Sequence, residues 1–214
     1  MNRPTTFAVA LLTAAFTLFA PLAQAQPKAG ADYSELKVAQ PVEAKGKIEV
    51  VEFFWYRCPH CYNLEPFLEP WVKKLPADVQ FRRIPAVLSD NWAVDAGMYY
   101  TFEALGVLDK VHRPFFDAIH RDRLDIRSEP AMTEWLKKHG IDRKKFDETY
   151  KSFGVQAKVK RAAQLSGTYQ IEGVPMLAVQ GKYTVSAEQG GSQAGMLATT
   201  DQLIDMLRKS PAKK

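Results

Sequence analysis

The sequence predicts an α/β domain whose chain is interrupted by an inserted helical block. Three observations predict this fold class. A strand-like segment, a helix and a second strand follow one another over residues 48–84; residues 89–169 carry helical patterns; and strand character returns after Gly173. A strand–helix–strand order implies a right-handed parallel crossover, so the late strands are expected to complete the same sheet.

The first 25 residues have the form of a secretory signal peptide. Arg3 gives a basic start, residues 7–22 are almost wholly apolar, and Ala23-Gln24-Ala25 is a small-x-small cleavage site. The apolar run is shorter than the roughly 20 residues that a membrane-spanning helix needs. We therefore expect export, with cleavage after Ala25.

The composition of the remaining chain limits its partners. Removing Arg3 lowers the formal net charge from +5 to +4, and the basic residues are scattered over the sequence. No basic block is interleaved with aromatic residues, so nucleic acid is not expected as a partner. After removal of the predicted signal peptide, the chain is still long enough for one domain with an insertion.

The first part of the α/β domain begins with a polar, irregular segment in which Tyr33–Val38 can form a short edge strand. The β-branched and aromatic run Ile48–Trp55 is the strongest strand candidate. A helix follows from Cys58 to about Lys74, since a proline directly after Cys58 suits a first helical turn. Pro66 and Pro70 predict a kink or a break in it. Residues 79–84 are expected to form the second strand.

The inserted block is expected to contain five helices. Apolar and aromatic residues recur at helical spacing in successive segments, and Gly106 and Gly140 stand where one helix would stop and the next begin. Pro114 is expected to mark a kink or a helix start. The stripes begin at Val94, Leu108, Met132, Phe146 and Val155, and they are most simply a helix–helix core.

The last part of the chain is expected to form a hairpin and a helix. Two short apolar runs flank Gln180-Gly181-Lys182, as in a β-hairpin. A glycine-rich loop spans residues 190–195, and Thr199 with Gln202 can form a capping box for the final helix. The expected divisions are 1–25 (signal peptide), 26–88 and 164–214 (the two parts of the α/β domain), and 89–163 (the helical insertion).

The only two cysteines, Cys58 and Cys61, are three positions apart where the first strand gives way to a helix. A Cys-x-x-Cys pair in this setting is typical of a dithiol that cycles between thiol and disulfide. Backbone N–H groups at the helix start stabilise a thiolate on Cys58, and His60 in the same turn can add charge or a donor. Cys61 lies one turn further in and is expected to be more buried.

Three other interpretations remain open at this point. Cys-x-x-Cys can be half of a structural zinc site, but such a site needs four ligands, and no second pair follows; we expect no metal. A structural disulfide gains stability by closing a long loop, and this loop has two residues. The pair can also be incidental on a peptide-binding protein.

Several stretches together resemble the DsbA family of periplasmic thiol:disulfide oxidoreductases. The resemblance rests on Val51-Glu52-Phe53-Phe54, Cys58-Pro59-His60-Cys61-Tyr62, Lys73-Lys74-Leu75-Pro76, Ala104-Leu105-Gly106-Val107, Gly173-Val174-Pro175 and Gly181-Lys182-Tyr183. It covers essentially the whole chain after residue 25. It implies a thioredoxin fold with an inserted all-helical domain, and location in the periplasm.

The resemblance also implies roles for the site residues. Cys58 matches the nucleophile and Cys61 the buried partner, and Pro59 and His60 match the intervening pair of the strongly oxidising members. Val174-Pro175 matches a loop whose proline is cis, packs beside the disulfide and pairs with the bound substrate strand.

The resemblance also extends to two acidic residues, Glu52 and Glu65, and differs at one basic residue, Arg83. Glu52 lies in the central strand and should be buried if both faces of the sheet are covered, which would raise its pKa and make it a proton donor or acceptor near Cys61. Glu65 matches a second family acid. Arg83 stands where the family has a lysine, and since arginine does not release its proton, a relay through this position is in doubt.

The expected function is that of a dithiol oxidase that gives its Cys58–Cys61 disulfide to reduced, newly exported proteins. The alternatives are a reductase or isomerase of the same compartment and a peptide-binding chaperone. The resemblance implies a DsbB-like membrane quinone reductase as reoxidant. We expect a monomer that uses no cofactor besides its own disulfide.

Overall fold

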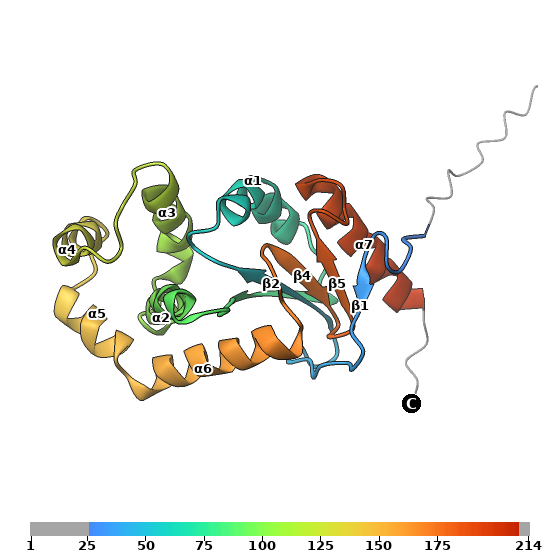
Figure 1. The fold of residues 1–214 in the computed structure, drawn as a ribbon, viewed down its shortest axis with the longest axis horizontal. Helices are drawn as coiled ribbons and strands as arrows, with labels where there is room; N and C mark the ends of the chain where they lie inside the picture. The colour runs from blue at the N-terminus through green and yellow to red at the C-terminus, as the bar shows by residue number, and fades with distance from the viewer. Residues whose placement is uncertain (1–25, 210–214) are drawn as a thin grey trace, which may run out of the picture.

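The computed structural model describes residues 26–209, which form a five-stranded mixed sheet with a helical block to one side (Figure 1). The predicted signal peptide lies outside the described residues. The strand order is β1-β5-β4-β2-β3. The strands are β1 (Ser34–Glu35), β2 (Ile48–Phe54), β3 (Val79–Pro85), β4 (Met176–Val179) and β5 (Tyr183–Ser186).

The central strand β2 joins the two parts of the α/β domain. It pairs in parallel with β3, which follows after one helix, and antiparallel with β4, which begins more than a hundred residues later. The β4–β5 hairpin turns at Gln180 and Gly181, which both have positive φ, the geometry of a tight hairpin turn. The α/β fold with a helical insertion and the hairpin are thereby confirmed.

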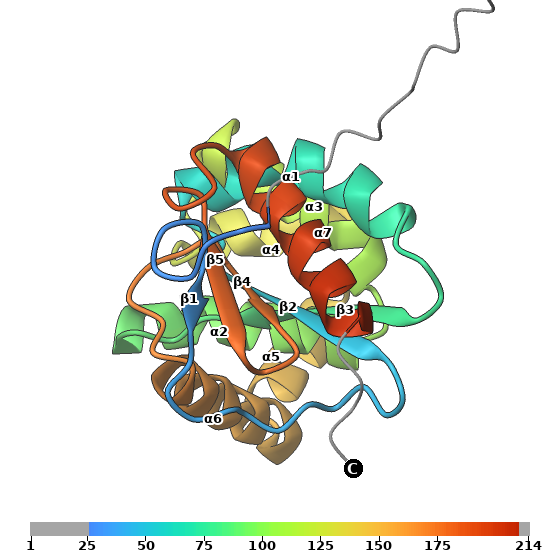
Figure 2. The ribbon, with the colours of Figure 1, turned by 90° about the vertical axis from the view of Figure 1, so that its right-hand side faces the viewer.

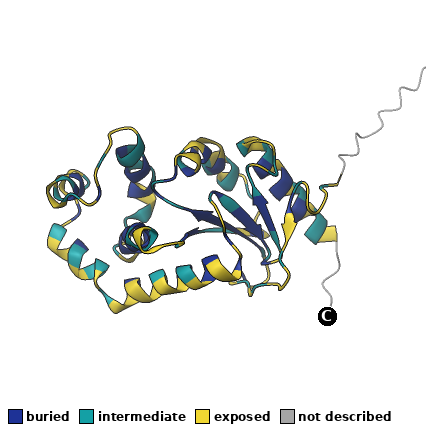
Figure 3. Cartoon of the chain, in the orientation of Figure 1, coloured by how far each residue is buried: buried dark blue, intermediate teal, exposed yellow. Residues whose placement is uncertain are grey.

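Helices cover both faces of the sheet. Figures 1 and 2 show the sheet between α1 (Pro59–Lys73) and α7 (Gln193–Lys209) on one side and α6 (Phe153–Thr168) on the other. Val50, Leu64, Leu177 and Leu203 belong to the core under α1 and α7, and Val51 packs in the larger core on the opposite side. Figure 3 shows the central strands as buried, so a polar side chain in β2 has no route to bulk water except between helices.

The inserted block contains five helices, as expected from the apolar stripes. They are α2 (Asp90–Ala104), α3 (Leu108–His120), α4 (Glu129–Lys138), α5 (Arg143–Tyr150) and α6. Pro114 lies inside α3 and does not start it. The expected boundary at residue 163 falls within α6, which runs from the block back to the sheet. Helix α3 packs on α1, and α2 reaches the edge strand β3.

Two local details differ from the expectations. Helix α1 runs through Pro66 and Pro70 without a break, and both prolines lie on its exposed side. Helix α7 begins at Gln193 and not near Thr199. The hydroxyl of Ser192 accepts a hydrogen bond from the Gly195 N–H at 3.0 Å and so caps the helix earlier than the Thr199–Gln202 pair would.

Candidate functional site

The two cysteines lie where β2 ends and α1 begins. Cys58 is the N-cap residue of α1, with extended backbone geometry (φ −83°, ψ 116°), and Pro59 occupies the first helical turn. Both cysteines are free thiols in this structure. Cys58 retains 7% of its surface and Cys61 none, as expected from their positions in the helix. An approaching sulfur atom therefore reaches Cys58 and not Cys61.

The two sulfur atoms have opposite acidities. The hydrogen bond from the Cys61 thiol, the backbone N–H groups of Cys61 and His60, and the charge of His60 lower the Cys58 pKa to about 6, against the effect of burial. Burial raises the pKa of Cys61 well above its usual value, and the Cys58 sulfur and the Glu52 carboxylate raise it further. At neutral pH, Cys58 is mostly a thiolate and Cys61 a thiol.

The loop before β4 lies against Cys58. The Val174–Pro175 peptide bond is cis, as the family resemblance implied, and Cys58 Sγ lies 3.3 Å from the Val174 carbonyl oxygen, to which it donates a hydrogen bond when it is protonated. Pro59 and His60 are exposed beside this contact, and Val174 is half-buried. The structure thus brings together the predicted residues of the α1 start and the predicted loop.

Glu52 is fully buried in β2. In the parallel pairing its neighbour on β3 is Arg83, whose Nε donates to the Glu52 carboxylate at 2.8 Å. Burial raises the Glu52 pKa to about 8, although the Arg83 charge opposes the rise. The other carboxylate oxygen of Glu52 has no hydrogen-bond partner. Glu52 is therefore mostly protonated at neutral pH.

Glu65 lies on α1 and shares Arg83 with Glu52. The Arg83 Nη2 atom lies 3.2 Å from both Glu65 oxygens. Burial pushes the Glu65 pKa upward, but the neighbouring His112 and Arg83 outweigh burial and lower it. One arginine therefore holds one ionised carboxylate and one protonated carboxyl. We call Glu52, Glu65 and Arg83 the buried charge cluster.

Sequence reasoning missed two side chains that extend this cluster. His112 of α3 is buried, and its Nε2 lies 3.6 Å from Glu65 Oε1, while its Nδ1 lies 2.9 Å from the Tyr56 hydroxyl. A usable signal was present, because His112 stands on the apolar stripe of α3, between Val111 and Phe115. A titratable side chain at such a position needs a buried polar partner.

A further contact that the sequence did not reveal holds the residue before Cys58 in place. Arg57 donates from Nε to buried Asp95 of α2 at 2.8 Å and lies over the Trp55 ring, which itself stacks on Trp92. The α2 start is thereby fastened to the loop that carries Cys58, so the helical block helps to orient the site.

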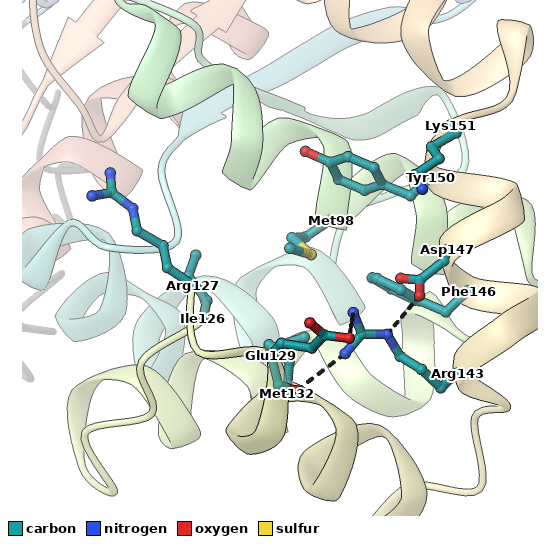
Figure 4. A pocket seen from close by; sticks show the side chains of 10 residues that line it. All are labelled: Met98, Ile126, Arg127, Glu129, Met132, Arg143, Phe146, Asp147, Tyr150 and Lys151. Carbon is teal, nitrogen blue, oxygen red and sulfur yellow. Dashed lines mark hydrogen bonds and ion pairs between the residues drawn. The ribbon is translucent and has the colours of Figure 1, made fainter.

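A cavity in the helical block does not take part in this site. It has a volume of about 400 Å³, with Met98 and Phe146 at its floor (Figure 4). On its rim, Arg143 contacts Asp147 at 2.8 Å and Glu129 at 3.9 Å. Within residues 26–209 there is no group of three or more side chains suited to hold a metal ion, nor a helix long and apolar enough to cross a membrane.

Comparison with known proteins agrees with this geometry. Residues 88–198 match the family described as "DSBA-like thioredoxin domain". The chain is 43% identical over 189 residues to a protein of Azotobacter vinelandii named "Thiol:disulfide interchange protein DsbA", covering 88% of each chain. A protein of the same name from Pseudomonas aeruginosa is 41% identical over 198 residues, covering 92% of this chain and 94% of the relative.

Solved structures give the same result. The crystal structure of Pseudomonas aeruginosa DsbA superposes with a TM-score of 0.81 at 42% identity, covering 87% of this chain and 97% of that one. The oxidoreductase DsbA from Xylella fastidiosa has a TM-score of 0.81 at 29% identity, covering 87% of this chain and all of the other. The likeness extends over both parts of the sheet and the helical block.

Proposed function

This chain belongs to the DsbA-like thioredoxin family and is a thiol:disulfide oxidoreductase, and from this premise we propose that Cys58 and Cys61 carry the exchanged disulfide and give it to reduced, newly exported proteins. The observation that carries the proposal is the opposite acidity of the two sulfurs. A stabilised Cys58 thiolate favours the reduced enzyme, which makes the disulfide form an oxidant.

The first step is attack of a client thiolate on Cys58 Sγ of the oxidised enzyme. A bond forms between the client sulfur and Cys58, the Cys58–Cys61 bond breaks, and Cys61 leaves with the electron pair. Glu52 gives its proton to this buried thiolate, because the pKa of Cys61 is raised well above its usual value and therefore above the Glu52 pKa of about 8. The mixed disulfide on Cys58 is then left with a neutral Cys61 thiol behind it.

The second step releases the oxidised client. The second thiolate of the client attacks the client sulfur of the mixed disulfide, and Cys58 leaves as a thiolate. Its low pKa makes it a good leaving group. Val174 and Pro175 hold the client strand beside Cys58 during both steps, and the exposed His60 and Pro59 border the same approach.

Reoxidation completes the cycle. The family implies a DsbB-type reoxidant, and we propose that a membrane quinone reductase of this kind accepts the two electrons from the reduced enzyme. We further propose that the enzyme acts as a monomer in the periplasm, after cleavage following Ala25. It uses no metal or organic cofactor, because the Cys58–Cys61 pair itself stores the electrons.

Equilibration with glutathione tests the direction of transfer. We expect the protein to be much more oxidising than thioredoxin, whose potential is about −270 mV, because only the reduced form gains from the Cys58 thiolate. The fraction of reduced protein is measured by alkylating free thiols across a series of glutathione ratios. A potential close to that of thioredoxin would instead indicate a reductase and overturn the oxidase proposal.

The same asymmetry predicts how stability depends on pH. The Cys58 pKa of about 6 in the folded reduced protein lies below its usual 9.0, so the thiolate adds stability that is lost as pH falls through 6. Relative to pH 5, the excess stability of the reduced over the oxidised form should grow by about 1.4 kcal/mol at pH 7 and about 2.7 kcal/mol at pH 8. Urea unfolding of both redox forms measures it, and a difference that stays constant over this range contradicts the assignment.

A further inference from the structure

The net positive charge of this chain comes from one part of the fold, namely α5, α6 and the turn between them. Residues 143–168 contain seven basic and two acidic residues, a formal charge of +5, whereas the whole chain after residue 25 carries +4. The rest of that chain is therefore close to neutral. Helix α6 contains Lys158, Lys160 and Arg161 and no acidic residue. This part of the surface attracts anionic partners.

Neighbouring carboxylates neutralise only some of these cations. On α5, two of the three basic residues are paired with carboxylates of the same helix. On α6, Lys158 contacts Glu103 of α2 at 2.7 Å. Within residues 26–209, no carboxylate lies in ion-pair contact with Lys160 or Arg161, and both side chains are exposed. Their charges therefore face solvent without an internal counter-ion.

The two unpaired cations share one side of α6 with an exposed aromatic ring. Phe153, Ala157, Lys160, Arg161 and Gln164 follow one another at helical spacing, and all five are exposed. The opposite side of the helix packs in the larger core. Figure 3 shows the outer side of α6 as exposed along the helix. We call these five residues the α6 face.

Phe153 makes this face unusual among charged surfaces. It begins α6 and is the most exposed of the large apolar side chains in the described part of the chain, at 89%. An aromatic ring beside lysine and arginine suits the headgroup region of an anionic membrane, where the ring enters the apolar boundary and the cations meet phosphates. A soluble acidic protein would satisfy the two charges but would leave the ring in water.

The position of α6 keeps the redox site accessible during such contact. Helix α6 forms one edge of the molecule, on the side of the sheet opposite α1 (Figures 1 and 2). Cys58 caps the start of α1. A molecule that rests on α6 therefore has α1 and its N-terminal cysteine turned away from the lipid.

We propose that the α6 face holds the protein on an anionic membrane surface, with Lys160 and Arg161 on lipid phosphates and Phe153 at the level of the headgroups. The contact is reversible and sensitive to salt, because it depends on two charges and a single ring. It brings the oxidoreductase to the membrane that holds the proposed quinone-linked reoxidant. That benefit rests on the proposed function, whereas the binding itself does not.

Flotation with lipid vesicles tests the proposal on the protein cleaved after Ala25. Vesicles of phosphatidylglycerol and phosphatidylethanolamine should bind it at low salt, vesicles of phosphatidylcholine alone should not, and about 0.5 M NaCl should release it. Lys160→Gln combined with Arg161→Gln should weaken binding to the anionic vesicles about 25-fold, at about five-fold for each charge. Phe153→Ser should weaken it about ten-fold, because the ring no longer leaves water.

Lys73→Gln combined with Lys74→Gln is the matched control, since it removes two exposed charges at the end of α1, on the other side of the sheet. It should change vesicle binding by less than about three-fold. Equal losses in the two double variants would show that only net charge matters, and unchanged binding in Phe153→Ser would point to acidic polypeptides as partners; either result overturns the proposal, as does no binding to the anionic vesicles. Peptide oxidation in solution should be the same in all these variants, so vesicle binding and the proposed function fail or succeed separately.

Discussion

Replacing Cys58 by serine should lower the rate of client oxidation by more than about a thousand-fold, to the uncatalysed level. The reason is chemical: without Sγ at this position there is no disulfide to give and no sulfur that a client thiolate can reach. The measurement is the oxidation of a reduced two-cysteine peptide by stoichiometric oxidised protein, followed by mass spectrometry.

Cys61→Ser is the matched control, since it also removes one sulfur and the disulfide. Its Cys58 thiolate remains at the helix start, so the variant should form a stable mixed disulfide with a peptide that carries an activated disulfide. Cys58→Ser should form none, because Cys61 is fully buried. Peptide oxidation that survives in Cys58→Ser would favour a chaperone with incidental cysteines.

Replacing Arg83 by methionine should destabilise the fold by about 3–5 kcal/mol at pH 7 to 8. The substitution keeps much of the side-chain volume but leaves Glu52 and Glu65 without their shared cation. Isolated carboxylates in a buried site must either remain charged at high cost or bind protons. The loss should therefore shrink as pH falls towards 4, where the carboxyls of the folded variant and of its unfolded chain are mostly protonated.

Arg208→Met provides the comparison, because Arg208 also contacts two carboxylates, Asp78 and Asp205, but at the exposed end of α7. Its loss should stay below about 1 kcal/mol. Arg83→Lys keeps the positive charge and should retain most of the stability. Equal losses for the two methionine variants in urea unfolding would show that burial of the charge cluster is not what makes Arg83 important.

Local patterns were sufficient to predict the elements that carry the chemistry. The apolar run of β2 and the Cys-Pro-His-Cys start of α1 are each contained in one short segment, so their geometry follows from neighbouring residues. The burial of Glu52 could also be predicted, since a strand between two covered faces leaves no exposed side. Its burial is confirmed.

Local patterns could not predict which side chains besides Arg83 lie close to Glu52 and Glu65. His112 and Tyr56 are 56 positions apart and meet only because α3 packs on α1. That packing depends on the complete arrangement of the block, which spacing within a helix does not determine. The start of α7 was missed for a more local reason. The sequence offers two possible N-caps, Ser192 and Thr199. A close backbone approach between Gly190 and Gly195 favours the earlier cap.

The pairing of β2 with β4 determines how late during synthesis the surroundings of the cysteines are completed. Ribosomal synthesis releases the cysteines and Glu52 long before residues 176–179, of which Leu177 pairs with Glu52 in the sheet. Until that late segment arrives, water reaches Glu52 and the Val174 carbonyl is not beside Cys58. An incomplete chain therefore lacks both the Val174 contact at Cys58 and the pairing of Leu177 with Glu52, and the surroundings of the cysteines are complete only when the last strands close the sheet.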